Sequence, residues 1–200
     1  MNQTRLFASV VLAGIATAVA LSAAPASATP ITYHAQLTGA AEDPANASPG
    51  VGNAVVTFDD AAHTLRVVVD FSTLSAPVTV AHIHCCTLHS GTGIVGVATT
   101  TPTFPGFPSG VTAGSYDTLF DLTDLASYRP GFVADHGGTA AGAEAALGVG
   151  LAAGKAYLNI HTTTFAGGEI RGFLVPEPAS LALLGIGLLG LAMLRCRWPA

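Results

Sequence analysis

Apolar and polar side chains alternate in two stretches of the sequence, ITYHAQL at residues 31–37 and LRVVVDF at residues 65–71. Successive side chains of a β-strand point to opposite faces of a sheet, so this period of two indicates strands with one buried face. We expect further strands at residues 51–58, 78–84, 94–99, 115–122, 156–161 and 169–174. The pattern predicts a mainly β domain, either an antiparallel β-sandwich or a barrel-like sheet.

One segment departs from this alternation. Residues 139–153 are rich in alanine, and Glu144, Leu147 and Leu151 recur there at helical spacing. We expect a short helical insertion that ends at Gly154, and another helical turn within residues 128–136. The sequence has no internal repeat of the solenoid type. Residues 29–174 are therefore expected to form one domain.

The N-terminus has the order of a signal peptide. Arg5 precedes an uncharged apolar run, and a triplet of small residues that ends at Ala28 follows it. Signal peptidase accepts small side chains at its cleavage site, so we expect residues 1–28 to be removed by a cut between Ala28 and Thr29. The alternative is an N-terminal anchor that stays on the protein.

The C-terminal segment, residues 175–200, has three parts. Pro176, Glu177 and Pro178 precede an apolar stretch at about residues 179–194, and a basic tail ends the chain. A helix of ~16 residues spans ~24 Å, somewhat short of a ~30 Å hydrocarbon core, but it inserts if its flanks adapt. The arginines of the tail favour the cytoplasm, which places the preceding domain on the other side of the membrane. We therefore expect an exported protein attached to the membrane by a C-terminal transmembrane helix.

This arrangement resembles the PEP-CTERM sorting signal of Gram-negative bacteria, over the last ~25 residues. The resemblance implies that an exosortase-type membrane protease recognises Pro176, Glu177 and Pro178, removes the helix and passes the protein toward the cell surface. The protein would then lie on the periplasmic side of the inner membrane at first, and later at the cell surface or outside the cell. A permanent single-span anchor is the alternative that the same residues support.

The charge of the central part excludes one class of partner. Residues 29–175 contain four basic and eleven acidic residues and no basic stripe. Nucleic acid is therefore not an expected partner.

The side chains best suited to chemistry lie in AHIHCC at residues 81–86. On a strand, His82 and His84 share a face and present two imidazoles together. Cys85 and Cys86 follow directly, and a mixed imidazole and thiolate set suits zinc or copper. His161 would complete such a site if its strand were a neighbour. The alternative is that the histidines are structural and bond to the backbone.

The two cysteines have no other partner in the mature domain, because Cys196 lies in the tail. Consecutive Cα atoms lie ~3.8 Å apart, whereas disulfides prefer ~4.4 to 6.8 Å, so a bond between Cys85 and Cys86 is not the expected default. Metal thiolates, a strained vicinal disulfide, free thiols and a link to another chain all stay open.

A second polar group lies in YLNIHT at residues 157–162 and GEIRG at residues 168–172. The two runs flank a Gly-Gly turn and predict a β-hairpin. Glu169 and Arg171 share a face, and we expect them to bond to each other, with Asn159 across the hairpin, as a structural polar ladder.

Three motifs, TGAAEDP at residues 38–44, AHIH at residues 81–84 and the YLNIHT and GEIRG pair, are similar to the CHRD domain first described in chordin. The match spans nearly the whole of residues 29–174, in order. It implies a β-rich extracellular module without catalytic residues or an established cofactor. The expected function is a non-enzymatic cell-surface or extracellular-matrix component, whose partner would be an exopolysaccharide or another surface protein.

The alternative function is a copper- or zinc-binding exported protein, with redox activity as a further option. His82, His84 and His161 resemble the His-x-His strand pair and the late histidine of copper/zinc superoxide dismutase. His89 and His136 do not reproduce the zinc-loop ligands of that family, so we expect simple metal binding and not dismutase activity. Convergence of the three histidines would favour this function over the first.

Overall fold

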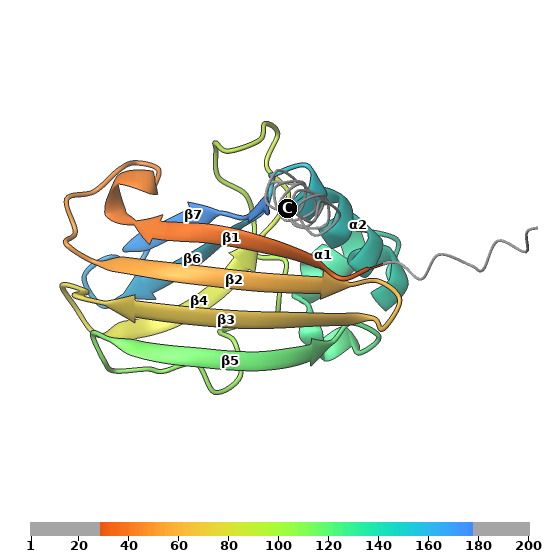
Figure 1. The fold of residues 1–200 in the computed structure, drawn as a ribbon, viewed down its shortest axis with the longest axis horizontal. Helices are drawn as coiled ribbons and strands as arrows, with labels where there is room; N and C mark the ends of the chain where they lie inside the picture. Colours follow the sequence, from red (N-terminus) through yellow and green to blue (C-terminus); the bar gives the residue numbers. More distant parts are fainter. Residues whose placement is uncertain (1–28, 178–200) are drawn as a thin grey trace, which may run out of the picture.

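The computed structural model describes residues 29–177, which form a curled sheet with helices at one end (Figure 1). The strands are β1 (Ile31–Thr38), β2 (Val51–Asp59), β3 (Thr64–Ser72), β4 (Val78–His84), β5 (Gly114–Asp121), β6 (Tyr157–Thr162), β7 (Ile170–Phe173) and β8 (Val175–Pro176). The helices are α1 (Pro130–Asp135) and α2 (Ala140–Ala152), with 3-10 turns at Gly39–Ala41 and Leu125–Ser127. The expected signal peptide, the transmembrane helix at residues 179–194 and Pro178 lie outside the described residues. None of the helices in residues 29–177 is both long and apolar enough to cross a membrane.

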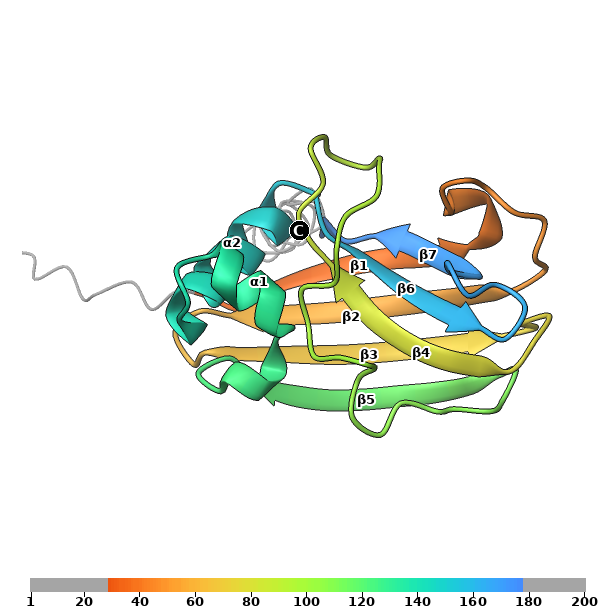
Figure 2. The same cartoon turned by 180° about the vertical axis from the view of Figure 1, so that it is seen from behind.

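All strands belong to one sheet in the order β4-β6-β7-β1-β2-β3-β5, and β8 adds to β1. Neighbouring strands pair antiparallel. The sheet curls until β4 and β6 lie behind β2 and β3, as the two opposite views show (Figures 1 and 2). The prediction of a mainly β, antiparallel fold is confirmed, and the form is a half-barrel, not the two separate sheets of a sandwich.

The core lies inside the curl and follows the predicted alternation. In β3, Leu65, Val67, Val69 and Phe71 are buried, while Arg66 and Asp70 are exposed. Strand β6 differs, because every one of its residues is buried. Its inner face packs on the core, so its outer face must be covered by loops, and this covered outer face carries the polar side chains.

The helical predictions are confirmed. Thr139 caps α2, where its hydroxyl oxygen accepts a hydrogen bond from the amide of Gly142 at 3.1 Å, and Gly154, with a φ of 64°, follows the helix end. Glycine tolerates this left-handed conformation without steric cost, which is why it terminates helices. The shorter helix α1 occupies the predicted turn within residues 128–136.

The strand predicted at residues 94–99 is wrong. This segment makes only isolated bridges, from Val97 to His84 and from Thr99 to Tyr128. Its backbone groups bond to several partners in turn: Ile83 accepts from the amide of Ala98 at 2.9 Å, and the imidazole of His84 donates to the carbonyl of Val95 at 2.7 Å. Because the bonds go to side chains as well as to backbone, no regular ladder forms.

Candidate metal centre

Three histidines meet on the outer face of β4 and β6. His82 and His84 share this face of β4, while the alternate residues Ala81 and Ile83 are buried in the core. Strand β6 pairs antiparallel with β4 and places His161 opposite Val80. The ring centroids lie 5.0 Å apart for His82 and His161, 5.4 Å for His82 and His84, and 6.1 Å for His84 and His161. The structure thus brings together the three histidines that the spacing singled out.

The cluster is buried although it lies on the outer face of the sheet. The exposed fractions are 6% for His82 and 8% for each of the other two histidines. The segments that supply backbone partners, around Val95, Pro102 and Ala166, all belong to loops. These loops shield the imidazoles from water.

Each imidazole uses one nitrogen to bond to a backbone carbonyl. His82 Nε2 bonds to Pro102 at 2.9 Å, His84 Nδ1 to Val95 at 2.7 Å, and His161 Nδ1 to Ala166 at 2.9 Å. A carbonyl oxygen only accepts, so these three nitrogens must carry the proton. The other nitrogen of each neutral ring then presents a lone pair.

The remaining nitrogens, His82 Nδ1, His84 Nε2 and His161 Nε2, are buried and have no hydrogen-bond partner within residues 29–177. One nitrogen of each ring lies within 4.8 Å of one nitrogen of each other ring. Buried polar atoms without partners are uncommon in folded proteins, and each requires a physical explanation. A bound ion that accepts three lone pairs would explain all three at once.

The electrostatics keep these rings neutral. Burial lowers the pKa of His82 to about 4, and the charges that His161 and His84 would carry lower it further. Burial also lowers the pKa of His84 to about 4, with smaller contributions from His161, Arg171 and Arg129. Burial lowers the pKa of His161 as well. Neutral imidazole is the form that binds metal ions, so the donors are ready at neutral pH.

The dimensions fit a metal ion with a small adjustment. Zinc–nitrogen bonds of ~2.0 Å allow ligand nitrogens at most ~4 Å apart, so nitrogens that lie up to 4.8 Å apart must approach by about an ångström. No carboxylate or thiolate within residues 29–177 joins the group. The donor set of this cluster is therefore three imidazoles.

Tyr157 is a neighbour of the cluster that was missed in the sequence. Its ring stacks on His84 with centroids 4.7 Å apart and planes 7° apart. Its hydroxyl donates to the carbonyl of Val95 at 3.3 Å, the same carbonyl that His84 uses. The Arg171 guanidinium lies over the Tyr157 ring, 4.8 Å from its centroid. The period of two that joins Asn159 and His161 also includes Tyr157, so this signal was present in the strand pattern.

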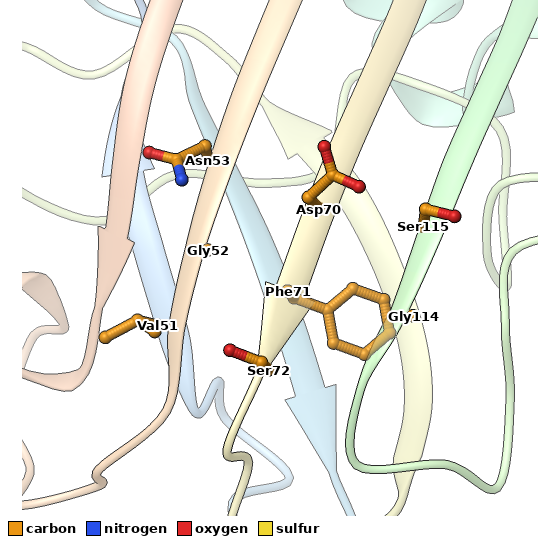
Figure 3. A pocket seen from close by; sticks show the side chains of 8 residues that line it. All are labelled: Val51, Gly52, Asn53, Asp70, Phe71, Ser72, Gly114 and Ser115. Atoms are coloured by element: carbon orange, nitrogen blue, oxygen red, sulfur yellow. The ribbon is translucent and has the colours of Figure 1, made fainter.

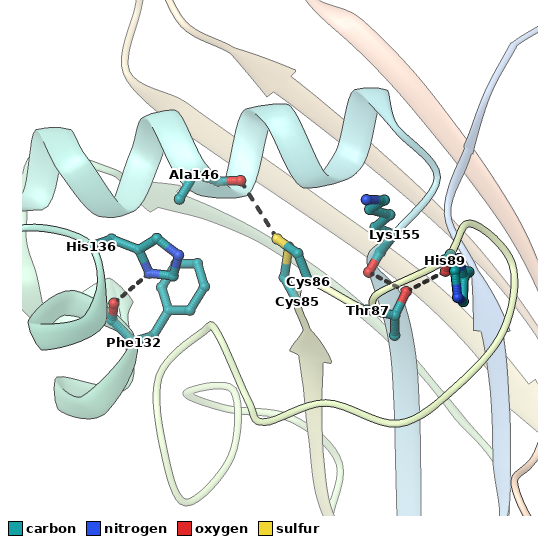
Figure 4. The surroundings of a disulfide bond; sticks show 8 residues. All are labelled: Cys85, Cys86, Thr87, His89, Phe132, His136, Ala146 and Lys155. Atoms are coloured by element: carbon teal, nitrogen blue, oxygen red, sulfur yellow. Dashed lines mark hydrogen bonds between the residues drawn. A yellow bond between two sulfur atoms is a disulfide. The ribbon is translucent and has the colours of Figure 1, made fainter.

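The two cysteines are bonded to each other as a vicinal disulfide (Figure 4). Of the four options that the sequence leaves open, the structure has the vicinal disulfide, which was not the expected default, and the cysteines supply no thiolate to the histidine cluster. Both sulfurs point toward α2, where Gly150 has no side chain and so leaves room for them. The sulfur of Cys86 lies 3.6 Å from the carbonyl oxygen of Ala146 in the same helix. The side chains of the disulfide therefore pack against α2, and not toward the imidazoles.

The expected pair of Glu169 and Arg171 is also wrong, since no ion pair joins them in the described part of the chain. Glu169 lies in the turn just before β7, outside the strand. The alternation of side chains along a strand therefore does not place it beside Arg171. Arg171 instead donates to the carbonyls of Ala41 and Gly93, and lies 3.9 Å from Glu42. Asn159 is opposite Arg171 in the ladder, but its Oδ1 has no hydrogen-bond partner within residues 29–177.

Glu169 instead organises a buried network of hydroxyl donors. Its Oε1 accepts from the Ser48 hydroxyl at 2.6 Å and from the amide and hydroxyl of Ser75 at 2.6 and 2.8 Å. Its Oε2 accepts from the Thr162 hydroxyl at 2.6 Å. Burial alone raises the pKa of Glu169, but these donors outweigh it, and the pKa lies below its ordinary value. The group is a structural anchor for the loops around β7.

A pocket at the ends of β2, β3 and β5 lies away from this chemistry (Figure 3). Asn53, Asp70 and Ser115 are among its lining residues. No histidine, cysteine or tyrosine among residues 29–177 lines it. The histidine cluster is therefore the stronger candidate for a functional site.

The fold and the site together define a half-barrel β domain with a buried cluster of three histidines. The chain belongs to the CHRD domain family, whose model matches residues 33–174 and so includes all three histidines. A PEP-CTERM protein-sorting motif matches residues 174–197. Neither a curated protein nor a solved structure matches the chain. The resemblances to the CHRD domain and to the PEP-CTERM signal are confirmed, and they indicate an exported protein that is sorted by an exosortase-type protease.

Proposed function

We propose that this exported protein binds one copper or zinc ion through His82, His84 and His161. Two observations support the proposal: one nitrogen of each ring lies within 4.8 Å of one nitrogen of each other ring, and each ring has one buried nitrogen without a partner within residues 29–177. A backbone carbonyl orients each ring through its other nitrogen. Metal-binding histidines commonly donate their second nitrogen to a carbonyl or carboxylate in this way, which sets the tautomer and strengthens the ligand.

The energetics favour a bound ion over an empty structural cluster. A buried polar atom without a partner costs ~1 to 3 kcal/mol, so three such nitrogens cost several kcal/mol of folding free energy. A purely structural set of imidazoles would be expected to bond to one another or to further backbone groups. A metal ion instead turns three unfavourable lone pairs into three ligand bonds.

We further propose that the domain acts as a non-enzymatic module at the cell surface or in the extracellular matrix. Catalytic zinc sites keep an open coordination position for water or substrate, whereas these nitrogens are enclosed by loops. The sorting motif supports the location, and membership of the CHRD family supports the role of a surface component. An exopolysaccharide or another surface protein is the partner that this role requires.

Metal analysis of the full chain, isolated from a producing cell, tests the proposal. We expect about one equivalent of copper or zinc by elemental mass spectrometry, and its loss in the His82→Ala/His84→Ala variant. His136→Ala is the matched control, because His136 bonds to Phe132 and lies outside the cluster. A folded wild-type chain that stays metal-free after exposure to both ions would overturn the proposal.

A further inference from the structure

We infer that the three-histidine site selects monovalent copper, Cu(I), over zinc and over Cu(II). This inference rests on the proposed function and names the ion that the site takes. Three features of the described residues carry it: the number of ligands, their neutrality, and the charges that surround them.

The ligand number suits Cu(I) better than zinc. Protein zinc sites are almost always four-coordinate, and a three-histidine zinc site completes its shell with water or substrate. Here the free nitrogens are buried, and no fourth histidine, cysteine or carboxylate within residues 29–177 joins the cluster. Cu(I) readily accepts three nitrogen ligands in a plane without a fourth ligand. It therefore needs no additional donor in this enclosed space.

The ligands add no negative charge to offset the ion. Three neutral imidazoles leave the full charge of a bound ion inside the protein. The cost of burying a charge grows with its square, so a divalent ion costs about four times as much as a monovalent one. Thiolate or carboxylate ligands would remove this difference, but the disulfide excludes Cys85 and Cys86 as thiolates.

The surrounding charges act in the same direction. Arg171 lies over the ring of Tyr157, and Tyr157 stacks on His84. The charge of Arg171 lowers the pKa of His84, so it acts on the site. The carboxyl group nearest to Arg171 is Glu42, at 3.9 Å, and burial raises the pKa of Glu42 to about 7. Glu42 therefore supplies only part of a negative charge at neutral pH. A second positive charge on the ion would add to the repulsion from Arg171.

These features also oppose oxidation of the bound ion. Conversion of Cu(I) to Cu(II) removes one electron and leaves an additional positive charge in the same buried place. The ordinary affinity order of divalent ions, in which Cu(II) exceeds zinc, does not govern a site where burial and charge select against both. We therefore expect the copper to stay monovalent in air.

Competition titrations on the full chain test the inference. Cu(I), kept reduced under anaerobic conditions, is titrated against a Cu(I)-specific bicinchoninate chelator, and zinc against a zinc-binding dye. We expect one Cu(I) per chain and an affinity at least ~100-fold above that for zinc, a difference of about 2.7 kcal/mol. X-ray absorption should show Cu(I) with three nitrogen neighbours, before and after exposure to air.

Two variants of Arg171 isolate the contribution of charge. Arg171→Gln removes the charge, and Arg171→Lys retains it. Only Arg171→Gln should therefore lower the ratio of the Cu(I) affinity to the zinc affinity, by about tenfold. Circular dichroism establishes that both variants fold. Their comparison separates charge from packing, because both lose the guanidinium.

The outcomes separate this inference from the proposed function. Zinc or Cu(II) bound more tightly than Cu(I), through the same histidines, would overturn the inference and leave the proposed function intact. A folded chain that binds none of these ions would overturn both. Equal Cu(I)-to-zinc ratios in the two Arg171 variants would overturn the role of charge.

Discussion

At the scale of single residues, Glu42 is a buried carboxyl group next to one cation. It lies 3.9 Å from Arg171, and its side chain is only 5% exposed. Burial raises the pKa of Glu42 to about 7, although Arg171 and the amide of Asp43 lower it in part. Its Oε1 has no hydrogen-bond partner within residues 29–177. The protonated form of this carboxyl is therefore favoured in the folded protein.

This shift predicts a pH dependence of stability. Between about pH 4.5, the ordinary value, and about pH 7, the folded chain holds a proton on Glu42 that the unfolded chain has released. The free energy of unfolding should therefore fall as pH rises through this window. The Glu42→Gln variant should lack this contribution. The free energy of unfolding of the wild type and of the variant is measured by denaturation at each pH, and their difference removes the contribution of the histidines, which both proteins share. A difference that is constant from pH 4.5 to 7 would contradict the shift.

Glu169 is the opposite kind of buried carboxyl group, because hydroxyl and amide donors from Ser48, Ser75 and Thr162 surround it. Hydrogen bonds to a charged group contribute ~1.5 to 3 kcal/mol each. We expect Glu169→Gln to lower the free energy of unfolding by ~2 to 3 kcal/mol in urea denaturation. Asp117→Asn is the control: Asp117 forms an exposed ion pair with Arg66, and such pairs contribute ~0 to 1 kcal/mol. Similar losses in both variants would argue against the network.

At the scale of elements, the short strand β8 holds part of the sorting motif against the domain. Pro176 pairs with Tyr33 of β1, and the amide of Glu177 donates to the carbonyl of Thr32 at 3.1 Å. The Glu177 carboxylate also lies 2.6 Å from His34 Nε2. A protease that reads Pro176 and Glu177 must therefore accept them beside β1 or detach them from it.

Removal of the His34 side chain should loosen this contact. An exposed ion pair contributes up to ~1 kcal/mol, so His34→Ala should speed hydrogen exchange at the Glu177 amide about two- to fivefold. His63→Ala is the matched control, because His63 pairs with Glu144 of α2 and not with β8. Hydrogen exchange at the Glu177 amide is measured by mass spectrometry on the full chain and compared between the two variants. No change in the His34 variant would mean that the backbone pairing alone holds β8.

Close packing between elements also depends on a glycine of β7. A Cβ on Gly172 would collide with the carbonyl of Gln36 in β1. The missing side chain therefore lets β7 approach β1 and join the two halves of the curled sheet. Through this junction, β7, β6 and β4 continue the sheet beyond β1, and β4 and β6 carry the three histidines.

At the scale of the whole molecule, metal binding should stabilise the fold. An ion that binds only the folded state adds ~2.7 kcal/mol when its free concentration is 100 times the dissociation constant. For a domain of this size, that corresponds to a rise in melting temperature of roughly 5 to 15 °C. Calorimetry of the full chain with and without Cu(I) measures this shift, and the His82→Ala/His84→Ala variant should show none. An equal shift in the variant would place the ion elsewhere.

The sequence by itself predicted most of the strands, both helical segments and the two family matches. The strands at residues 31–37 and 65–71 can be predicted from local sequence, because the polarity of each side chain indicates whether it lies on the buried or the exposed face. His82 and His84 share a face for the same local reason. Targeting segments are likewise read from composition and order, which is why the sorting motif was identified without a structure.

Only the tertiary structure decided what these residues contact. The pairing of β4 with β6 brings His161 beside His82, and loop closure supplies the carbonyls of Pro102, Val95 and Ala166. The packing of the disulfide against α2, and the separate partners of Glu169 and Arg171, also depend on segments that are distant in the chain. Periodicity specifies a face, but it carries no information about which strand becomes a neighbour. That choice follows from burial of the whole core, so the convergence of three imidazoles belongs to the fold and not to any motif.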